Sequence, residues 1–457
     1  MRKFNHFSIS ALLLGIAVSA YNWLSGSQGS DSFAQPRSAM SSRPFLLEGR
    51  PFFPIGALGA PLDLIDESPG KNGKFDRMFG ELAQNGMNVY MPIFQTSEEH
   101  RTSSEDVLEF YPEPCLSRRS DPLGGIAALK RHKLAVFLPA FIVETESDLL
   151  AKKELDEDEA TKKLKALQDC YAGVPIFAYD NYDDAVMYEG KGIPIKKVRQ
   201  LKKLVENLRH GETPYVIVLH PTEESLSHIA QEDIKGAWQK TIRDNVSRYS
   251  TSDIADSVGV YSYPVPFSPL ASVGAAVEQV RTLQSAQLRP LVVLQGLGLR
   301  DAQQNPDARR PTEQETRFMT FQAVVRGAGG IAWWGANFIP SNSELWQSIK
   351  RAARDINIIK NWLVEADSPF QVQAEGLEVL LKQPSAGGDK HLLVAVNSQP
   401  KAKNVEISLP APKVLRNVRD ILKQQPVLVS EGRFTESFEA YGVRLYEMAI
   451  DDLSSPR

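Results

Sequence analysis

The chain has 457 residues, with 52 Lys and Arg against 56 Asp and Glu, which gives a net charge of −4. Its 42% hydrophobic and 24% charged residues are typical of a globular protein and exclude collagen-like, coiled-coil and wholly disordered chains. The lack of a basic excess argues against nucleic-acid binding, and two cysteines are too few for a disulfide-rich scaffold or an all-cysteine metal cluster.

The first 34 residues predict an export segment. A short positive start precedes the uncharged stretch 7–24, and Ser32 and Ala34 fit a signal-peptidase site, with a second candidate ending at Ala20. A cleaved signal peptide and an uncleaved anchor both fit, because the apolar run is near the minimum that spans a bilayer. We expect an exported protein, periplasmic, extracellular or anchored at the outer face of the membrane, with any membrane attachment through this segment only.

The two cysteines, Cys115 and Cys170, leave two alternatives open. They can form a disulfide in an oxidising compartment, or both can remain unpaired. Their spacing in the sequence does not choose between these states.

Residues 44–366 predict an α/β domain. Short apolar runs alternate with amphipathic helical stretches such as 195–208, and near-continuous apolar runs are typical of parallel strands buried on both faces. The eight strand candidates are Phe53–Leu58, Met87–Phe94, Leu134–Phe141, Pro175–Tyr182, Tyr215–His220, Val258–Pro264, Pro290–Leu297 and Gly330–Phe338. Eight βα units predict a (β/α)8 TIM barrel. A doubly wound open sheet is the alternative, although no G-x-G-x-x-G follows the first strand.

Residues 368–451 predict a small antiparallel β-sandwich domain. Short strand candidates are separated there by turn-forming segments such as 385–389 and 410–412. The strand candidates are Leu377–Leu381, His391–Asn397, Asn404–Leu409, Val427–Val429, Phe438–Tyr441 and Val443–Met448.

Carboxylates gather where the fourth strand ends, which in a βα barrel is the face that carries reactive groups. Asp180, Asp183 and Asp184 fall within five positions, and Glu144 follows the third strand. Neighbouring carboxylates raise one another's pKa, so one of them can stay protonated as a general acid while another acts as base in glycoside hydrolysis. A solvated acidic loop, or helix capping by Asp183, is the alternative interpretation.

Aromatic and amide side chains recur at the other strand ends. Tyr261 and Tyr263 share one side of the sixth strand, and of the adjacent Trp333 and Trp334 we favour Trp334 as the site residue. Flat aromatic faces suit sugar rings, and the Gln295 amide can orient a sugar hydroxyl. The predicted substrate-binding residues are Asn181, Tyr261, Tyr263, Gln295, Trp334 and Asn337.

Other reactive residue types predict no further chemistry. The sequence has no His-x-His, Cys-x-x-Cys or G-x-S-x-G motif, so we expect no metal, no cofactor and no serine nucleophile elbow. His220 is a lone histidine, for which a structural role is the better interpretation. Glu315 follows Thr312 at capping-box spacing, which explains it without catalysis.

Five segments together resemble the glycoside hydrolase superfamily of barrel enzymes. Residues 45–56 are similar to the lead-in of the first barrel strand, and 179–182 to the motif of the fourth strand. Residues 310–315 and 327–334 look like the seventh helix and the eighth strand, and 439–446 like the closing strand of the C-terminal sandwich.

The resemblance implies a protein that hydrolyses or binds a polysaccharide or oligosaccharide. In such enzymes the fourth and seventh strands supply glutamates, and these positions fall here on Asn181 and Gln295. Asp180 is then the expected general acid, with Glu144 or Asp183 as base. A non-catalytic carbohydrate-binding barrel and an envelope or exopolysaccharide accessory protein are the alternatives.

Overall fold

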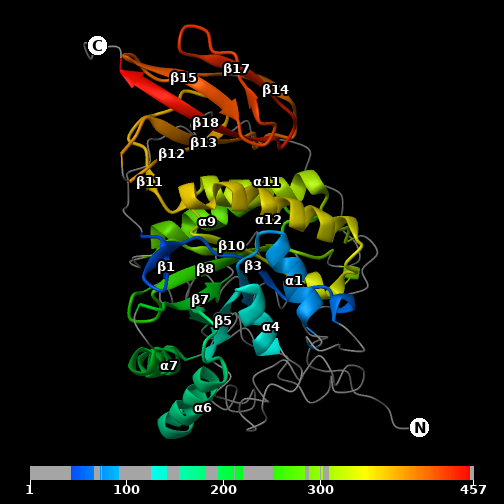
Figure 1. The fold of residues 1–457 in the computed structure, drawn as a ribbon, viewed down its shortest axis with the longest axis vertical. Coiled ribbons are helices and arrows are strands. Elements are labelled where there is room, and N and C mark those ends of the chain that lie inside the picture. The colour runs from blue at the N-terminus through cyan, green and yellow to red at the C-terminus, as the bar shows by residue number, and fades with distance from the viewer. Residues whose placement is uncertain are drawn as a thin grey trace, which may run out of the picture.

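The computed structural model describes residues 43–65, 73, 75–91, 125–140, 154–180, 194–209, 212–219, 251–283, 288–298, 300–301, 308–385 and 387–452. Two domains are visible in Figure 1, a barrel and, at the C-terminal end, a pair of β-sheets. Among the described residues, no helix combines the length and the apolar character needed to cross a bilayer.

Eight parallel strands form a closed barrel in the order β10-β3-β4-β5-β6-β7-β8-β9. Their bounds are β3 Ile55–Leu58, β4 Val89–Met91, β5 Ala135–Pro139, β6 Ile176–Asp180, β7 Tyr215–Leu219, β8 Ser257–Ser262, β9 Leu291–Gln295 and β10 Gly330–Trp334. Each lies within one of the eight predicted runs or starts one residue before it, so the TIM-barrel prediction is confirmed and the open sheet is excluded.

Helices cover the outside of the barrel (Figure 1). They are α1 Asp76–Gln84, α4 Gly125–His132, α6 Glu157–Cys170, α7 Ile195–Leu208, α9 Ser272–Leu283, α11 Glu313–Val325 and α12 Glu344–Leu363. Side-chain hydrogen bonds fix the start of helix α11. The Thr312 side chain accepts from the Glu315 amide, and Glu315 bonds back in a complete capping box, as predicted.

A hairpin that the sequence analysis did not recognise as strands closes the N-terminal end of the barrel. Its strands are β1 (Phe45–Leu47) and β2 (Arg50–Phe52). The rings of Phe45 and Phe52 lie 5.0 and 5.7 Å from that of Phe177 on β6, inside the barrel. This apolar plug fills the N-terminal end of the barrel.

The C-terminal domain consists of a six-stranded sheet facing a two-stranded one. The larger sheet contains β11 (Ala366–Asp367), β12 (Glu378–Gln383), β13 (Lys390–Val396), β18 (Val443–Asp452), β15 (Lys413–Asp420) and β16 (Gln425–Pro426), and the smaller one pairs β14 (Lys403–Ile407) with β17 (Phe434–Phe438). A shared apolar cluster between them confirms the antiparallel sandwich. The strand β15 was not predicted, and the predicted strand at 427–429 is not one.

The sandwich packs against the barrel through α11 and α12, which lie between the two domains in Figure 1. Arg326 on α11 makes a 2.6 Å ion pair with Glu378 on β12, and Arg317 donates to the Val443 carbonyl at 3.1 Å. Burial opposes ionisation of Glu378, but the hydrogen bond and charge of Arg326 outweigh it and hold its pKa below the usual range. Apolar residues of both domains belong to one continuous core.

Cys170, at the end of α6, is disulfide-bonded. The other cysteine of the sequence, Cys115, lies outside the described residues.

Candidate functional site at the barrel mouth

Asp180 is the last residue of β6 and points into the barrel. Its strand carries a bulge: Val136 pairs with Ile176, but Phe137 pairs with Ala178, so Phe177 is an extra residue. Beyond the bulge, Ala178 lies in the inner cluster, whereas Tyr179 lies outside. Because strand residues alternate, Asp180 returns to the inner face, and its carboxylate lies half-buried at the mouth.

The outward position of Tyr179 is fixed by helix α6. Gln168 donates to the Tyr179 hydroxyl at 2.6 Å, and burial raises the pKa of this phenol more than the Gln168 hydrogen bond lowers it. The tyrosine therefore stays neutral and held in the outer layer. It fixes the C-terminal end of β6 and therefore the orientation of Asp180, the next residue.

An aromatic series lines the mouth on the side of β8 and β10. The ring of Tyr261 lies 5.8 Å from that of Tyr263, which stacks on Trp334 at 5.4 Å with 21° between the planes. Trp334 in turn meets Phe338 edge to face at 6.0 Å. We call these four residues the aromatic series. Both tyrosines lie in the inner cluster, and Trp334 packs against it.

The two adjacent tryptophans point to opposite sides, as expected. Trp333 is 0% exposed in the outer layer, whereas Trp334 is half-buried and belongs to the aromatic series. Asn337 follows in the short helix η7 (Ala336–Phe338), and its Oδ1 atom is buried with no hydrogen-bond partner among the described residues. A buried acceptor of this kind is suited to a ligand hydroxyl.

Gln295 differs from the expected substrate-binding role. Its side chain is 0% exposed, and its Nε2 donates to the carbonyls of Val265 at 2.8 Å and Leu297 at 3.1 Å. Its Oε1 accepts from the Val265 amide at 3.0 Å. Because both ends of the amide are occupied, Gln295 is a clamp between β9 and the loop after β8, and it does not contact the space at the mouth.

Hydrogen bonds link the loops around half of the mouth. Gln295 ties β9 to the loop after β8, and the Gly296 amide donates to the Trp334 carbonyl at 2.7 Å. The Ser341 amide and hydroxyl donate to the Asp63 carboxylate at 2.9 and 2.7 Å, which joins the loops after β10 and β3. Gly335, at φ +91°, makes the turn after β10 that a side chain would obstruct. This half of the mouth is therefore preorganised.

Other carboxylates after β3 and β9 hold loops together. Asp63 binds Ser341, and Asp301 accepts two hydrogen bonds at 2.9 Å from Arg310. Burial disfavours the Glu315 charge, but two 2.6 Å hydrogen bonds from Arg309 and its contacts with Thr312 lower the pKa of Glu315 overall. These three carboxylates hold loops together, and Asp180 is the predicted catalytic carboxylate that the structure describes at the end of β6.

Several predicted site residues lie outside the described residues. These are Glu144, Asn181 and Asp183. His220, for which a structural role was expected, also lies outside them. The described residues also contain no group of three or more His, Cys, Asp or Glu side chains arranged to hold a metal ion.

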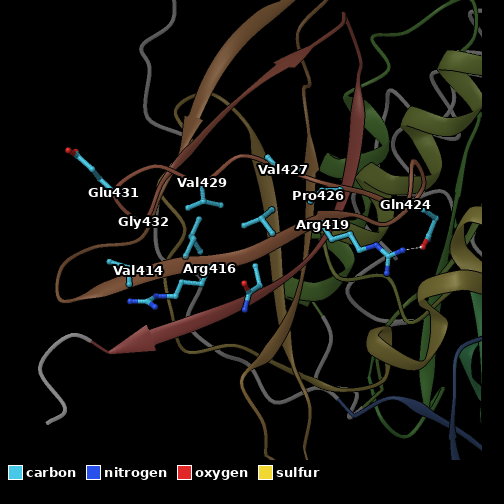
Figure 2. A pocket seen from close by; sticks show the side chains of 12 residues that line it. Val414, Arg416, Arg419, Gln424, Pro426, Val427, Val429, Glu431 and Gly432 are labelled. Carbon is cyan, nitrogen blue, oxygen red and sulfur yellow. Dashed lines mark hydrogen bonds between the residues drawn. The ribbon is translucent and has the colours of Figure 1, made fainter. Parts of the chain in front are cut away.

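A separate groove lies on the sandwich domain, between β15 and the segment after β16 (Figure 2). It has a volume of about 1160 Å³ and is lined by valines, by Arg416 and by Arg419, which donates to Gln424 at 2.6 Å. None of the predicted site residues and no aromatic ring lines it among the described residues. We therefore place the candidate functional site at the barrel mouth.

Solved glycoside hydrolases share this fold. A GH27 β-L-arabinopyranosidase from Geobacillus stearothermophilus, in complex with arabinose, matches at 12% identity and TM-score 0.52 over 87% of this chain and 97% of that chain. AmyP in complex with maltotriose matches at 10% identity and TM-score 0.50 over 86% and 96%. An α-amylase from Geobacillus thermoleovorans, complexed with acarbose, matches at 12% and 0.48 over 87% and 98%.

Sequence comparison adds no closer relative. No protein-family model matches the chain, and no curated protein matches it. The structural likeness establishes the fold alone, a closed eight-stranded βα barrel followed by antiparallel sheets.

Proposed function

We propose that the protein is a glycoside hydrolase that acts on an oligosaccharide or polysaccharide at the barrel mouth. The observation that carries this proposal is the position of Asp180 relative to the aromatic series. The strands β6 and β10 are four places apart in both directions around the eight-stranded barrel, so Asp180 and Trp334 end opposite strands.

A sugar ring between these residues would meet complementary groups on its two sides. The stacked pair Tyr263 and Trp334 presents a flat apolar wall to the C–H face of the ring. The Asn337 Oδ1 atom accepts a hydrogen bond from a hydroxyl, and Asp180 approaches from the opposite wall. A small number of polar groups around an apolar pocket is the usual composition of a ligand site.

Asp180 is proposed to protonate the leaving oxygen as general acid. Hydrolysis needs a second carboxylate, which either activates water or attacks the anomeric carbon. We propose Glu144 or Asp183 for this role. In the sequence, Glu144 follows β5, which lies beside β6 in the barrel, and Asp183 follows β6 itself. Asn181, adjacent to Asp180, is proposed to contact the substrate.

The structural neighbours support a carbohydrate ligand. Two of the similar solved structures are complexes with arabinose and with maltotriose. We extend this ligand class to the present chain because its aromatic series and Asp180 meet at the face that a βα barrel uses for ligands.

A non-catalytic carbohydrate-binding barrel is the second candidate. The Gln295 clamp favours it, because this amide occupies the seventh-strand position at which related enzymes are expected to carry a glutamate. Such a protein would use the aromatic series to hold a glycan without cleaving it.

We also propose that the protein is exported, through its first 34 residues. The uncharged apolar stretch 7–24 and the small residues Ser32 and Ala34 motivate this proposal. N-terminal sequencing of protein recovered from the producing cells would test it. A start after residue 20 or 34, or an intact N-terminus in the membrane fraction, is expected, whereas an intact cytoplasmic protein would contradict it.

A panel of polysaccharides tests the function. Residues 35–457 are incubated with each glycan, released sugars are detected by mass spectrometry, and retention is followed by affinity electrophoresis. Release of sugars supports the hydrolase. Retention without release supports the binding barrel, and neither release nor retention contradicts both.

A further inference from the structure

Phe338 is an exposed aromatic residue that the sequence analysis did not single out. Its side chain is 40% exposed, whereas Tyr261 and Tyr263 at the other end of the aromatic series are 4% and 5% exposed. The series therefore runs from the barrel interior out to solvent, and Phe338 is its outermost ring.

The position of this ring is fixed by its loop. The Phe338 amide donates to the Gly335 carbonyl at 3.0 Å, and the bonds from Ser341 to Asp63 hold the far side of the loop. Its plane lies 63° from that of Trp334, so the two rings are not stacked face to face. An ordered, partly exposed ring beside a binding site offers contact area at little entropic cost.

We propose that Phe338 forms an outer sugar-binding position, so that the substrate is a chain of sugars extending from Asp180 past Trp334 to the rim. This inference rests on the proposed function, because it assigns a second sugar of the same ligand. A sugar held between Asp180 and Trp334 fills the inner position, and only a longer ligand reaches Phe338. The protein should therefore distinguish chain length.

Calorimetric titration with short and long sugars tests this proposal. The probes are maltose and maltohexaose, cellobiose and cellohexaose, and xylobiose and xylohexaose. In the preferred series, we expect Phe338→Ala to weaken binding of the hexasaccharide about tenfold and to leave the disaccharide unchanged. Phe338→Tyr keeps a flat ring and should retain the wild-type affinity for both.

Ile358→Ala is the matched control. Ile358 is 54% exposed, and it lies fourteen residues into α12, about 20 Å along the helix from its start near the mouth. Removing this apolar side chain should change neither affinity. Thermal unfolding of each variant confirms that the fold is intact, as expected for substitutions at exposed positions.

Two results would contradict this inference and leave the proposed function intact. One is an equal loss of affinity for disaccharide and hexasaccharide in Phe338→Ala, and the other is no loss for either. If wild-type protein binds none of the six sugars and shows no activity on the polysaccharide panel, the proposed function fails, and this inference fails with it.

Discussion

Asp180 and Trp334 face each other across the barrel because they end opposite strands of a closed eight-stranded sheet. Each residue reaches this position for a local reason. The bulge at Phe177 turns Asp180 inward, and the alternation along β10 turns Trp334 inward while Trp333 enters the helical layer. The pair defines the two walls of the proposed site.

The neighbouring tryptophans should respond differently to truncation. Trp334→Ala removes part of the apolar wall, so we expect the affinity for the glycan to fall by about tenfold or more with a small change in stability. Trp333→Ala empties a fully buried site and should lower the free energy of unfolding by about 3–5 kcal/mol. Calorimetric titration and urea unfolding of both variants measure this. A larger loss of affinity in folded Trp333→Ala would contradict the assignment.

Gln295→Glu tests whether the seventh-strand position is structural. A carboxylate cannot donate to the Val265 and Leu297 carbonyls, so we expect a loss of about 1–3 kcal/mol in stability at neutral pH and no gain in hydrolysis. At acid pH the protonated glutamate recovers one donor, and the difference from wild type should shrink. Thermal unfolding at both pH values measures this. A stable variant with faster hydrolysis would show that the position is catalytic.

Lys382 should make stability depend on alkaline pH. Burial, together with the nearby Arg289 charge, lowers its pKa from 10.5 to about 8, despite a 2.6 Å ion pair with Asp367. Between about pH 8 and pH 10.5 the unfolded chain binds more protons than the folded protein. The free energy of unfolding should therefore rise with pH across this window, by up to about 3 kcal/mol. Above about pH 10, ionisation of tyrosines such as Tyr446, whose pKa is raised by burial, opposes the trend.

Urea unfolding from pH 8 to pH 10 checks this expectation, with Lys382→Met as the comparison. Burial opposes ionisation of Asp367, but the Lys382 and Arg289 charges hold its pKa below the usual range, so it does not titrate in this window and the variant should lose the upward slope. Equal slopes in wild type and variant would show that Lys382 is not the group responsible.

The sequence pattern was sufficient for the barrel because buried parallel strands have a clear signal. Runs such as Tyr215–Leu219 are apolar at every position, and their alternation with helices leaves few possible topologies. The hairpin of β1 and β2 was missed because its strands have three residues each and carry no regular alternation. The strand β15 was missed because charged residues interrupt it, and because most of its pairing is with β18, more distant in the sequence.

The site was harder to predict because side-chain direction depends on pairing. Counting by twos from Ile176, which packs in the outer layer, places Asp180 on the outer side, and only the pairing with β5 reveals the bulge that turns it inward. Gln295 ends a barrel strand, as a site residue would, yet its side chain forms hydrogen bonds with a loop thirty residues earlier in the sequence. Phe338 gave no motif at all, and only its exposure and its contact with Trp334 reveal it.

The most direct test compares hydrolysis rates of wild type, Asp180→Asn and Asp169→Asn on a glycan that the wild type cleaves. Asp169 is an exposed aspartate on α6, so its amide variant controls for the loss of one negative charge. The account predicts that Asp180→Asn lowers kcat about a hundredfold or more and still binds the glycan, while Asp169→Asn matches wild type. A folded Asp180→Asn variant with an unchanged rate would contradict it.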